Sequence, residues 1–240
     1  VRRQFFPHIA PQYSGYVGWR GLMSEAELSP ETFELLADAI TYCVLPNSHI
    51  VVYPIPTAGG SLEVGRRLIN YVWYRNVPTG GPLDDLTTDI HGVRRPVSVP
   101  PGLVRTEFVD EMKAFAGDLA PQLAEAIAKT DQPFVQVIVD IETDRMVAGN
   151  VALLGDGAFS ARPHAAAGTA KAAEDGWRLL AELERHDDLP AALSSWQQTQ
   201  VALGRQLVAR ARAIGERSQV HCTWQAGDPE LAFGLYGPGR

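Results

Sequence analysis

The 240-residue chain is long enough to bury a substantial core, as one large domain or two small ones. Hydrophobic residues make up 45% of it and charged residues 20%, which is ordinary for a globular protein. The formal net charge of -7 and the scattering of basic residues in pairs argue against a nucleic-acid surface, which needs clustered Lys and Arg.

Other global features narrow the class further. No apolar run approaches the roughly 20 residues of a membrane span, so neither a membrane nor a nucleic acid is an expected partner. The two cysteines, Cys43 and Cys222, are too few for a disulfide framework, and the cytoplasm is the expected location. The sequence opens on Val1 without an initiator methionine, which favours an excerpt from a longer chain over a processed or engineered start.

The first part of the sequence predicts strands and one helix. Residues 16–20 (YVGWR) are rich in β-branched and aromatic side chains, which favours a strand. A Ser-Pro pair followed by apolar residues at helical spacing predicts a helix over residues 30–41. Residues 49–55 and 68–77 are β-rich and separated by a Gly-rich turn, so we expect an antiparallel pair within a larger sheet.

The middle of the chain predicts mainly helices. Residues 80–101 are rich in Pro and Gly and are expected to be irregular, with one short helix near residues 83–90. Periodic apolar positions predict helices over about residues 105–117 and 121–129. Residues 134–139 (FVQVIV) predict a further strand.

The last third begins with a different kind of segment. Residues 150–156 form a continuous apolar run ending in Gly-Asp, which is typical of a strand buried on both faces of a parallel sheet. Two long helices follow, one over residues 168–185 and one from near Pro190 to about residue 216, with Asp187 or Asp188 as its cap. Polar residues interrupt the apolar stripe of the second helix, which favours ordinary packing over a coiled coil.

The turn after this apolar run carries the most chemical information. Ligands of open α/β sheets gather at the carboxyl ends of strands, where Asp156 could accept hydrogen bonds from sugar or sugar-alcohol hydroxyls. The small residues at 165–168 let a flat ring approach the backbone. The helix start near residues 168–170 offers unpaired N–H groups and about half a positive charge, which suits a reduced flavin. The alternative is a plain turn beside closely packed helices.

The whole stretch resembles the second flavin-binding motif of the class A flavoprotein monooxygenases, the para-hydroxybenzoate hydroxylase family. The motif is matched without a gap at Gly155, Asp156, Ala158, Pro163, Gly168 and Asp175. Residues 162–172 (RPHAAAGTAKA) are most similar to the branch of the family that contains 2,6-dihydroxypyridine 3-monooxygenase. Residues 16–21 resemble the strand after the family's Asp-Gly motif, and the pair 49–54 and 70–77 resembles its substrate-side sheet.

The resemblance implies both a fold and a cofactor site. It implies an α/β protein in which residues 1–135 form a mainly antiparallel substrate-binding sheet domain with helices. Residues 136–240 would be the C-terminal part of an incomplete, Rossmann-like FAD/NAD(P)-binding domain with long terminal helices. The resemblance also implies that FAD is contacted by the turn after the apolar run, by the loop around Pro163 and by the start of the following helix. The residues concerned are Gly155, Asp156, Pro163, Gly168, Thr169 and Ala170.

The sequence also departs from the family's pattern. Phe159 replaces the usual His, Gly157 an Ala, and Ala170 the common Asn. No Gly-x-Gly-x-x-Gly fingerprint, which holds the pyrophosphate of FAD in the family, occurs after a predicted strand. The alternative to an active enzyme is therefore a truncated, non-catalytic flavoprotein fragment that needs a partner or an N-terminal half.

The chemistry implied by the resemblance is hydroxylation of an electron-rich aromatic or hydroxypyridine-type ring, with FAD, NAD(P)H and O₂. His164 is the candidate for proton exchange with the substrate, against the alternative of a loop histidine that only bonds backbone. Tyr53 and Tyr74 are candidate substrate residues, against the alternative of packing; Tyr74 and Tyr71 should point to opposite faces. A flavin halogenase or reductase remains a further alternative. No metal site is expected, and a homodimer is possible.

Overall fold

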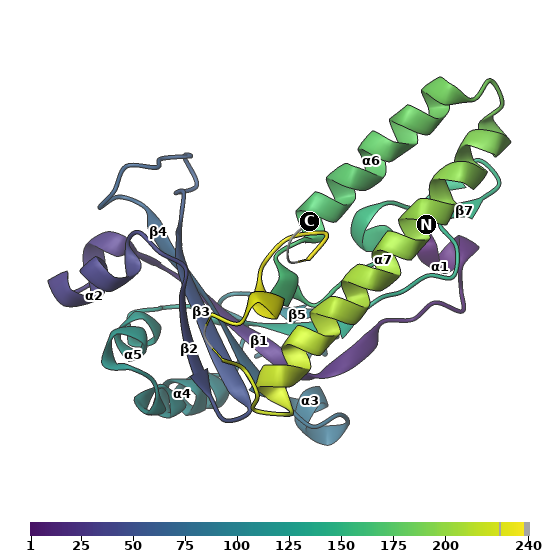
Figure 1. Ribbon diagram of the computed structural model, residues 1–240. Coiled ribbons are helices and arrows are strands. Elements are labelled where there is room, and N and C mark those ends of the chain that lie inside the picture. The colour runs from purple at the N-terminus through teal and green to yellow at the C-terminus, as the bar shows by residue number, and fades with distance from the viewer. Residues whose placement is uncertain (226, 238–240) are drawn as a thin grey trace. The chain divides into compact units, whose positions relative to one another are not determined.

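A computed structural model, which describes residues 1–225 and 227–237, divides the chain into two compact units (Figure 1). The sheet unit is Gly15–Ile138, and the helical unit combines Val1–Ser14 with Val139–Arg240. The first residues of the chain thus group with its C-terminal part. A mainly antiparallel sheet in a mixed α/β chain with long C-terminal helices confirms the predicted fold class.

The six-stranded sheet has the order β2-β3-β4-β1-β6-β5. The predicted pair is confirmed, because β3 and β4 are antiparallel, with Ile50 opposite Trp73. Two strands of this sheet, β2 and the two-residue β5, were not predicted. Strand β2 is short and reaches β3 through a tight turn in which Asn47 adopts a positive φ of 55°. The strands are β1 (Gln12–Ser24), β2 (Thr41–Leu45), β3 (Ser48–Ile55), β4 (Leu68–Asn76), β5 (Ser98–Val99) and β6 (Phe134–Asp140).

Helices α2, α4 and α5 lie on one side of this sheet (Figure 1). The predicted cap of α2 is confirmed, since the Ser29 side chain accepts a hydrogen bond from the Thr32 amide. This helix ends at Leu36, earlier than expected, because β2 begins at Thr41. The helices of the sheet unit are α2 (Pro30–Leu36), α3 (Gly81–Leu86), α4 (Thr106–Phe115) and α5 (Pro121–Ala128).

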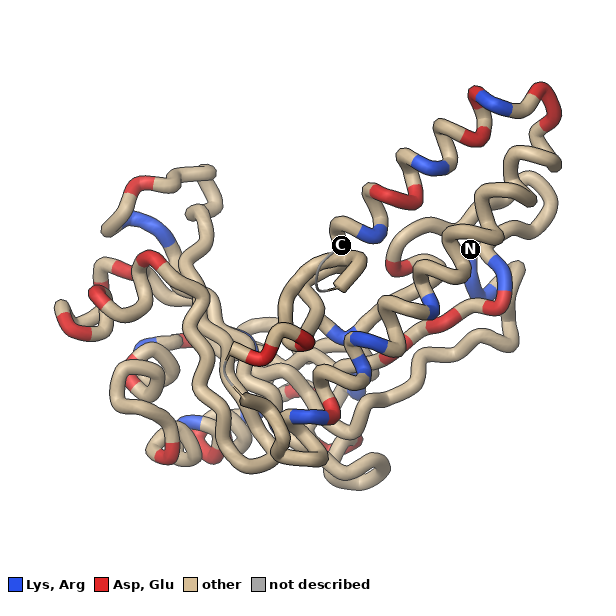
Figure 2. The backbone as a smooth tube through the Cα atoms, viewed as in Figure 1, with Lys and Arg blue, Asp and Glu red and all other residues tan. Residues whose placement is uncertain are grey.

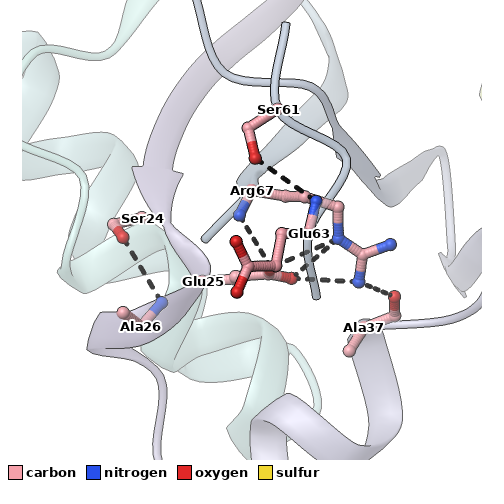
Figure 3. Close-up of polar contacts among 7 residues, drawn as sticks. All are labelled: Ser24, Glu25, Ala26, Ala37, Ser61, Glu63 and Arg67. Carbon is pink, nitrogen blue, oxygen red and sulfur yellow. Dashed lines mark hydrogen bonds and ion pairs between the residues drawn. The ribbon is translucent and has the colours of Figure 1, made fainter. Parts of the chain in front are cut away.

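A buried ion pair ties the end of β1 to the start of β4 (Figure 3). The Glu25 side chain is fully buried and accepts hydrogen bonds from the Arg67 backbone N–H at 2.7 Å and from its Nη2 at 3.1 Å. Arg67 also donates to the carbonyl of Ala37, just after α2. Burial raises the pKa of Glu25, but the hydrogen bonds and charge of Arg67 outweigh it, so the pKa lies below its usual value.

A second carboxylate joins α2 to α5. Glu125 accepts hydrogen bonds from the Ser29 amide and hydroxyl, both at 2.7 Å, and from the Thr32 hydroxyl and the Lys129 ammonium. The bonds from Lys129, Thr32 and Ser29 lower the pKa of Glu125 to about 2, against the opposing effect of burial. The same Ser29 that starts α2 therefore also docks this helix on α5.

Acid is expected to weaken the sheet unit through Glu125. A carboxylate whose pKa is lowered by folding stabilises the folded state fully when the pH is above the pKa of the unfolded chain, about 4.3. That stabilisation is lost as the pH falls through the pKa of the folded state. The free energy of unfolding, measured in urea, should therefore drop between about pH 4.3 and the folded pKa of about 2. Glu125→Gln should flatten this slope, whereas Glu34→Gln, at an exposed position of α2, should leave it unchanged. An equal slope in Glu125→Gln would contradict the assignment.

The helical unit is built on two long antiparallel helices that run side by side (Figure 1), α6 (Gly168–Arg185) and α7 (Leu189–Gln219). Both predicted helices are confirmed, and the cap of α7 is Asp188, which accepts a hydrogen bond from the Ala191 amide at 3.0 Å. The α7 stripe packs as expected within the unit, since Trp196 is buried in one cluster with Phe159.

The prediction of a parallel-sheet strand over residues 150–156 is wrong. Only β8 (Val151–Ala152) forms, antiparallel to β7 (Val147–Ala148) and half-buried, and a 3-10 turn over Gly155–Gly157 follows it. A buried strand needs hydrogen-bonding neighbours on both sides, and in the part of the chain that the structure describes only β7 lies beside it. The apolar run instead packs its Leu153 and Leu154 into the core of the helical unit.

Shorter elements complete the chain, and charge is distributed along the helices. Helix α1 (Arg2–Phe5) opens the helical unit, and single 3-10 turns occur at Glu25–Glu27, Ala116–Asp118, Pro163–Ala165 and Pro229–Leu231. Figure 2 shows acidic and basic residues interspersed along α6. Among the described residues, none of the helices combines the length and apolarity needed to cross a bilayer.

Candidate functional site

The Gly155 turn has a shape that only glycine fits. Its φ is +51°, and an added Cβ would lie 2.8 Å from the Cβ of Ala172 on α6. The Gly155 amide donates to Asp175 Oδ2 at 2.8 Å. The turn is therefore pressed against α6 and held there by a side chain of that helix.

A fully buried ion pair supports this turn. The Asp175 side chain is 0% exposed and that of Lys171 1%, and Lys171 Nζ binds Asp175 Oδ1. The Trp196 indole N–H of α7 donates to the Asp175 carbonyl at 2.9 Å. Lys171 Nζ also lies 5.5 Å from the centroid of the Phe159 ring. Because both charges are compensated inside the core, the pair fixes α6, the Gly155 turn and α7 to one another.

Phe159, one of the departures from the expected motif, is a core residue here. Its side chain is buried, and a Cβ on Gly204 of α7 would lie 2.4 Å from its ring. The phenyl ring thus packs directly on the α7 backbone, which explains why an apolar side chain is accommodated at this position.

The Asp156 side chain faces outward beside this buried support. Its residue is exposed, and within the described residues its carboxylate makes no hydrogen bond or ion pair. Its backbone carbonyl accepts a hydrogen bond from Arg2 Nη1 at 3.2 Å. The backbone of the turn is therefore fixed while the carboxylate remains available to a ligand.

The loop over residues 163–167, here called the cradle loop, is anchored at its start by the buried side chain of Arg162. Arg162 Nη2 pairs with Asp140 Oδ2 at 3.1 Å, and Arg212 of α7 shares this carboxylate at 3.2 Å. His164, in the 3-10 turn Pro163–Ala165, is 5% exposed, so the structure places the predicted proton-exchange residue in the interior of the helical unit.

Ala166 gives the cradle loop a strained backbone. It adopts the left-handed region with φ 49° and ψ 32°, and its amide donates to the Pro163 carbonyl at 2.9 Å. This conformation costs a non-glycine residue about 1–2 kcal/mol. Such strain persists only where the surroundings hold the backbone, and it concentrates at ligand sites.

The start of α6 is open to solvent. Residues 168–170 are exposed, and Ala167 provides no side-chain cap, in contrast to Asp188 at the start of α7. The Lys171 amide is the first in α6 to donate a helical hydrogen bond, to the Ala167 carbonyl at 2.8 Å. The three preceding amides therefore lack intrahelical acceptors and carry the positive end of the helix dipole. Together with Asp156, they form what we call the cradle: residues 155–157 and 163–170.

The sheet unit contributes a second group of candidate residues, an aromatic cluster on one face of the sheet. Tyr74 stacks on His49 with ring centroids 4.5 Å apart and meets Tyr16 edge-on at 6.0 Å. His49 also stacks on Tyr42 at 6.5 Å, and Tyr53 packs at the edge of the cluster. Tyr42 was not predicted, because β2 was missed. His49 lies opposite Tyr74 in the predicted β3–β4 pair, but its stacking on Tyr74 was not predicted.

Two phenols of this cluster, Tyr42 and Tyr74, are held in their neutral form. Burial raises the pKa of Tyr42 to about 12, with a further contribution from Tyr53. Burial also raises the pKa of Tyr74. At neutral pH these side chains are therefore hydrogen-bond donors as well as acceptors. Tyr71 points to the opposite face, as its odd spacing from Tyr74 predicted, and packs where a Cβ on Gly21 would lie 2.5 Å from its ring.

The sheet unit also contains a cavity, apart from the aromatic cluster. A cavity of about 480 Å³ lies between β4 and α4 on the face opposite Tyr74, with Trp19, Phe108 and Phe115 among its lining residues. Cys43 and Cys222 are not joined in a disulfide. The described residues contain no group of three or more His, Cys, Asp or Glu arranged to hold a metal ion. The predicted cofactor residues and His164 belong to the helical unit, and Tyr53 and Tyr74 to the sheet unit.

Comparison with known proteins defines the class. Residues 13–140 match the model of the FAD binding domain-like family, and the chain belongs to that family. It is 35% identical over 227 residues to 2,6-dihydroxypyridine 3-monooxygenase of Paenarthrobacter nicotinovorans, covering 95% of this chain and 56% of that protein. The crystal structure of 2,6-dihydroxypyridine-3-hydroxylase from Arthrobacter nicotinovorans superposes with a TM-score of 0.91 at 33% identity, covering 100% of this chain and 60% of the other.

A more distant relative is the FAD-dependent urate hydroxylase of Klebsiella pneumoniae, 29% identical over 84% of this chain and 44% of its own length. The predicted relationship to FAD-dependent hydroxylases is confirmed by these similarities, and FAD is the cofactor of the family. The chain spans about half the length of the curated relatives that it matches.

Proposed function

We propose that this chain forms the flavin-facing and substrate-facing parts of a monooxygenase that hydroxylates an electron-rich aromatic or hydroxypyridine-type ring, using FAD, NAD(P)H and O₂. The observation that carries this proposal is the 35% identity to 2,6-dihydroxypyridine 3-monooxygenase over 95% of the chain, which includes the cradle. A hydroxypyridine is the substrate class that this similarity supports best.

The cradle fits the cofactor in two respects. The Asp156 carboxylate, which has no partner among the described residues, would accept hydrogen bonds from the ribityl hydroxyls of FAD. The uncapped amides of residues 168–170 would donate to the pyrimidine end of the flavin, with Pro163 beside the ring. FAD, when bound, supplies the redox chemistry and the activation of O₂, while the protein binds, orients and excludes water.

The aromatic cluster fits a small heterocycle. The hydroxyls of Tyr53 and Tyr74 would hydrogen-bond to ring oxygens or nitrogens, and the apolar Val51 and Val72 beside them would exclude water. His164 would accept the proton that a hydroxylated ring loses when it becomes more electron-rich, because an imidazole exchanges protons near neutral pH.

A second candidate is a flavoprotein fragment that holds FAD only with a complementary chain. The observation that favours it is the lack of a Gly-x-Gly-x-x-Gly sequence among the 240 residues, since that turn binds the pyrophosphate in dinucleotide-binding folds. The cradle would then contribute part of a shared site.

Turnover of 2,6-dihydroxypyridine tests the proposal. The purified chain with FAD, NADH or NADPH and ¹⁸O₂ should give a product that carries one labelled oxygen, detected by mass spectrometry, without any need for chloride. His164→Gln should lower kcat by roughly 100-fold or more, whereas His186→Gln, in the turn between α6 and α7, should not change it. NAD(P)H oxidation without labelled product would contradict the hydroxylase proposal. Turnover that requires an added nucleotide-binding chain would support the second candidate.

A further inference from the structure

The C-terminal segment returns to the cradle loop and bonds to it. We call residues 227–237 the C-terminal strap. The Gly234 amide donates to the Ala165 carbonyl at 2.9 Å, and Arg210 of α7 donates from Nη1 to the Gly234 carbonyl at 2.6 Å. Arg210 Nη2 also donates to the Ala232 carbonyl. One arginine of α7 thus binds both the residue that bonds to the cradle loop, Gly234, and Ala232 just before it.

Apolar contacts support the same arrangement. Leu231 and Leu235 of the strap pack on a buried cluster formed by the cradle loop and α7. The cluster members from the loop are Ala165 and Ala167, which flank the left-handed Ala166. The strap therefore covers both neighbours of the strained residue.

Charged contacts hold the strap at its two ends. At its start, Asp228 pairs with Arg217 of α7 and accepts a hydrogen bond from the Glu230 amide at 2.9 Å. Near its end, the Tyr236 hydroxyl lies close to Glu174 of α6, whose pKa is lowered by Arg178 and by Tyr236. The strap therefore spans from α7 across the cradle loop to α6, and these contacts lie within the helical unit.

We infer that the C-terminal strap, held by Arg210, positions the cradle loop and so sets the geometry in which residues 168–170 present their amides to the flavin. The part of this inference that concerns the flavin rests on the proposed function. The part that concerns the position of the cradle loop does not. A non-glycine residue in the left-handed region relaxes unless its flanking peptides are held, and the strap holds one through Gly234 and covers the other. Arg210 is thus a positioning residue, which acts through the loop without contacting the cofactor.

Hydrogen exchange of the full chain tests this inference without FAD. Arg210→Met keeps most of the length of the side chain but removes its donors. Among residues 163–171 it should accelerate exchange of the hydrogen-bonded amides of Ala166 and Lys171 by about 10-fold, as expected for the loss of two net hydrogen bonds. Arg205→Met, a half-exposed arginine of the same helix, should leave that exchange unchanged. Gly234→Pro removes the donor to Ala165 and also forces the backbone away from its φ of 120°, so its effect on exchange should be at least as large as that of Arg210→Met. Arg210→Lys should restore part of the protection.

Flavin affinity, measured on the same variants, completes the test. Arg210→Met should weaken FAD binding by about 10-fold, in step with the faster exchange. Unchanged exchange in residues 163–171 would overturn the inference, and so would faster exchange with unaltered FAD affinity. If the unmutated chain binds no FAD, the proposed function fails, and the exchange rates alone still decide whether the strap holds the loop.

Discussion

Replacing Asp175 with alanine is expected to destabilise the helical unit by about 3–5 kcal/mol, because it leaves the Lys171 ammonium buried without its partner. The same change removes the acceptor of the Gly155 amide, which holds the turn against α6. The loss should appear as a lower urea midpoint of the helical unit, followed by far-UV circular dichroism. It should be larger than that of any exposed substitution, which is usually within about 0.5 kcal/mol.

A double variant separates the cost of an unpaired buried charge from the cost of lost packing. In the double variant Lys171→Met with Asp175→Leu, both buried charges are replaced by apolar groups, so most of the stability should return. Flavin binding should not return with it, since the Gly155 amide still lacks its acceptor. Asp187→Ala, in the exposed turn before α7, serves as the matched control. A loss below about 1 kcal/mol in Asp175→Ala would show that the pair does not support the turn.

Asp156→Ala is expected to have the largest effect on cofactor binding with little effect on stability. Charge-assisted hydrogen bonds from the ribityl hydroxyls would be lost, which should raise the Kd for FAD roughly 10- to 100-fold. The fold should persist, because the Asp156 side chain contacts no described residue by hydrogen bond or ion pair. Quenching of flavin fluorescence on binding provides the measurement.

The charge and the size of the side chain can be distinguished at this position. Asp156→Asn keeps the shape and one acceptor, so its affinity should lie between those of the unmutated chain and Asp156→Ala. Asp187→Ala removes an exposed aspartate elsewhere in the same unit and should leave the Kd unchanged. An unaltered Kd in Asp156→Ala, in a chain that binds FAD, would remove this carboxylate from the site.

The helices could be predicted from sequence because their signals are local. The sequence predicted α6 over Gly168–Arg185, and it left Asp187 or Asp188 as the cap of α7, of which Asp188 is the one that caps it. Residues 49–55 and 68–77 likewise predicted the β3 and β4 pair, since β-branched and aromatic runs around a Gly-rich turn identify a hairpin.

Two of the failures share a physical cause, which is dependence on distant partners. Residues 150–156 have the composition of a buried strand, but a strand forms only where neighbours complete its hydrogen bonds, and the described residues provide only β7. The short β2 was missed although its Thr41, Tyr42 and Val44 favour a strand, because it directly follows the predicted helix over residues 30–41. The stacking of His49 on Tyr74 was missed although the β3 and β4 pair was predicted, because the exact register of two strands does not follow from their composition.

The support of the candidate site was also hidden from sequence reasoning. The matched motif includes Asp175, but its role as the acceptor of the Gly155 amide follows only from the packing of the turn on α6. The spacing of Lys171 and Asp175 by four residues is a signal for a helical pair, although such pairs are usually exposed and this one is fully buried. The strap gives no periodic signal, because Arg210 binds its backbone carbonyls rather than its side chains.

The central claim is that the cradle binds the flavin through the Asp156 carboxylate and the first amides of α6. A crystal structure of the FAD complex tests it most directly. The claim predicts a ribityl hydroxyl within hydrogen-bond distance of the Asp156 carboxylate and the pyrimidine edge of the ring against the amides of residues 168–170. A flavin ring bound elsewhere, such as in the cavity between β4 and α4, with the cradle empty, would contradict it.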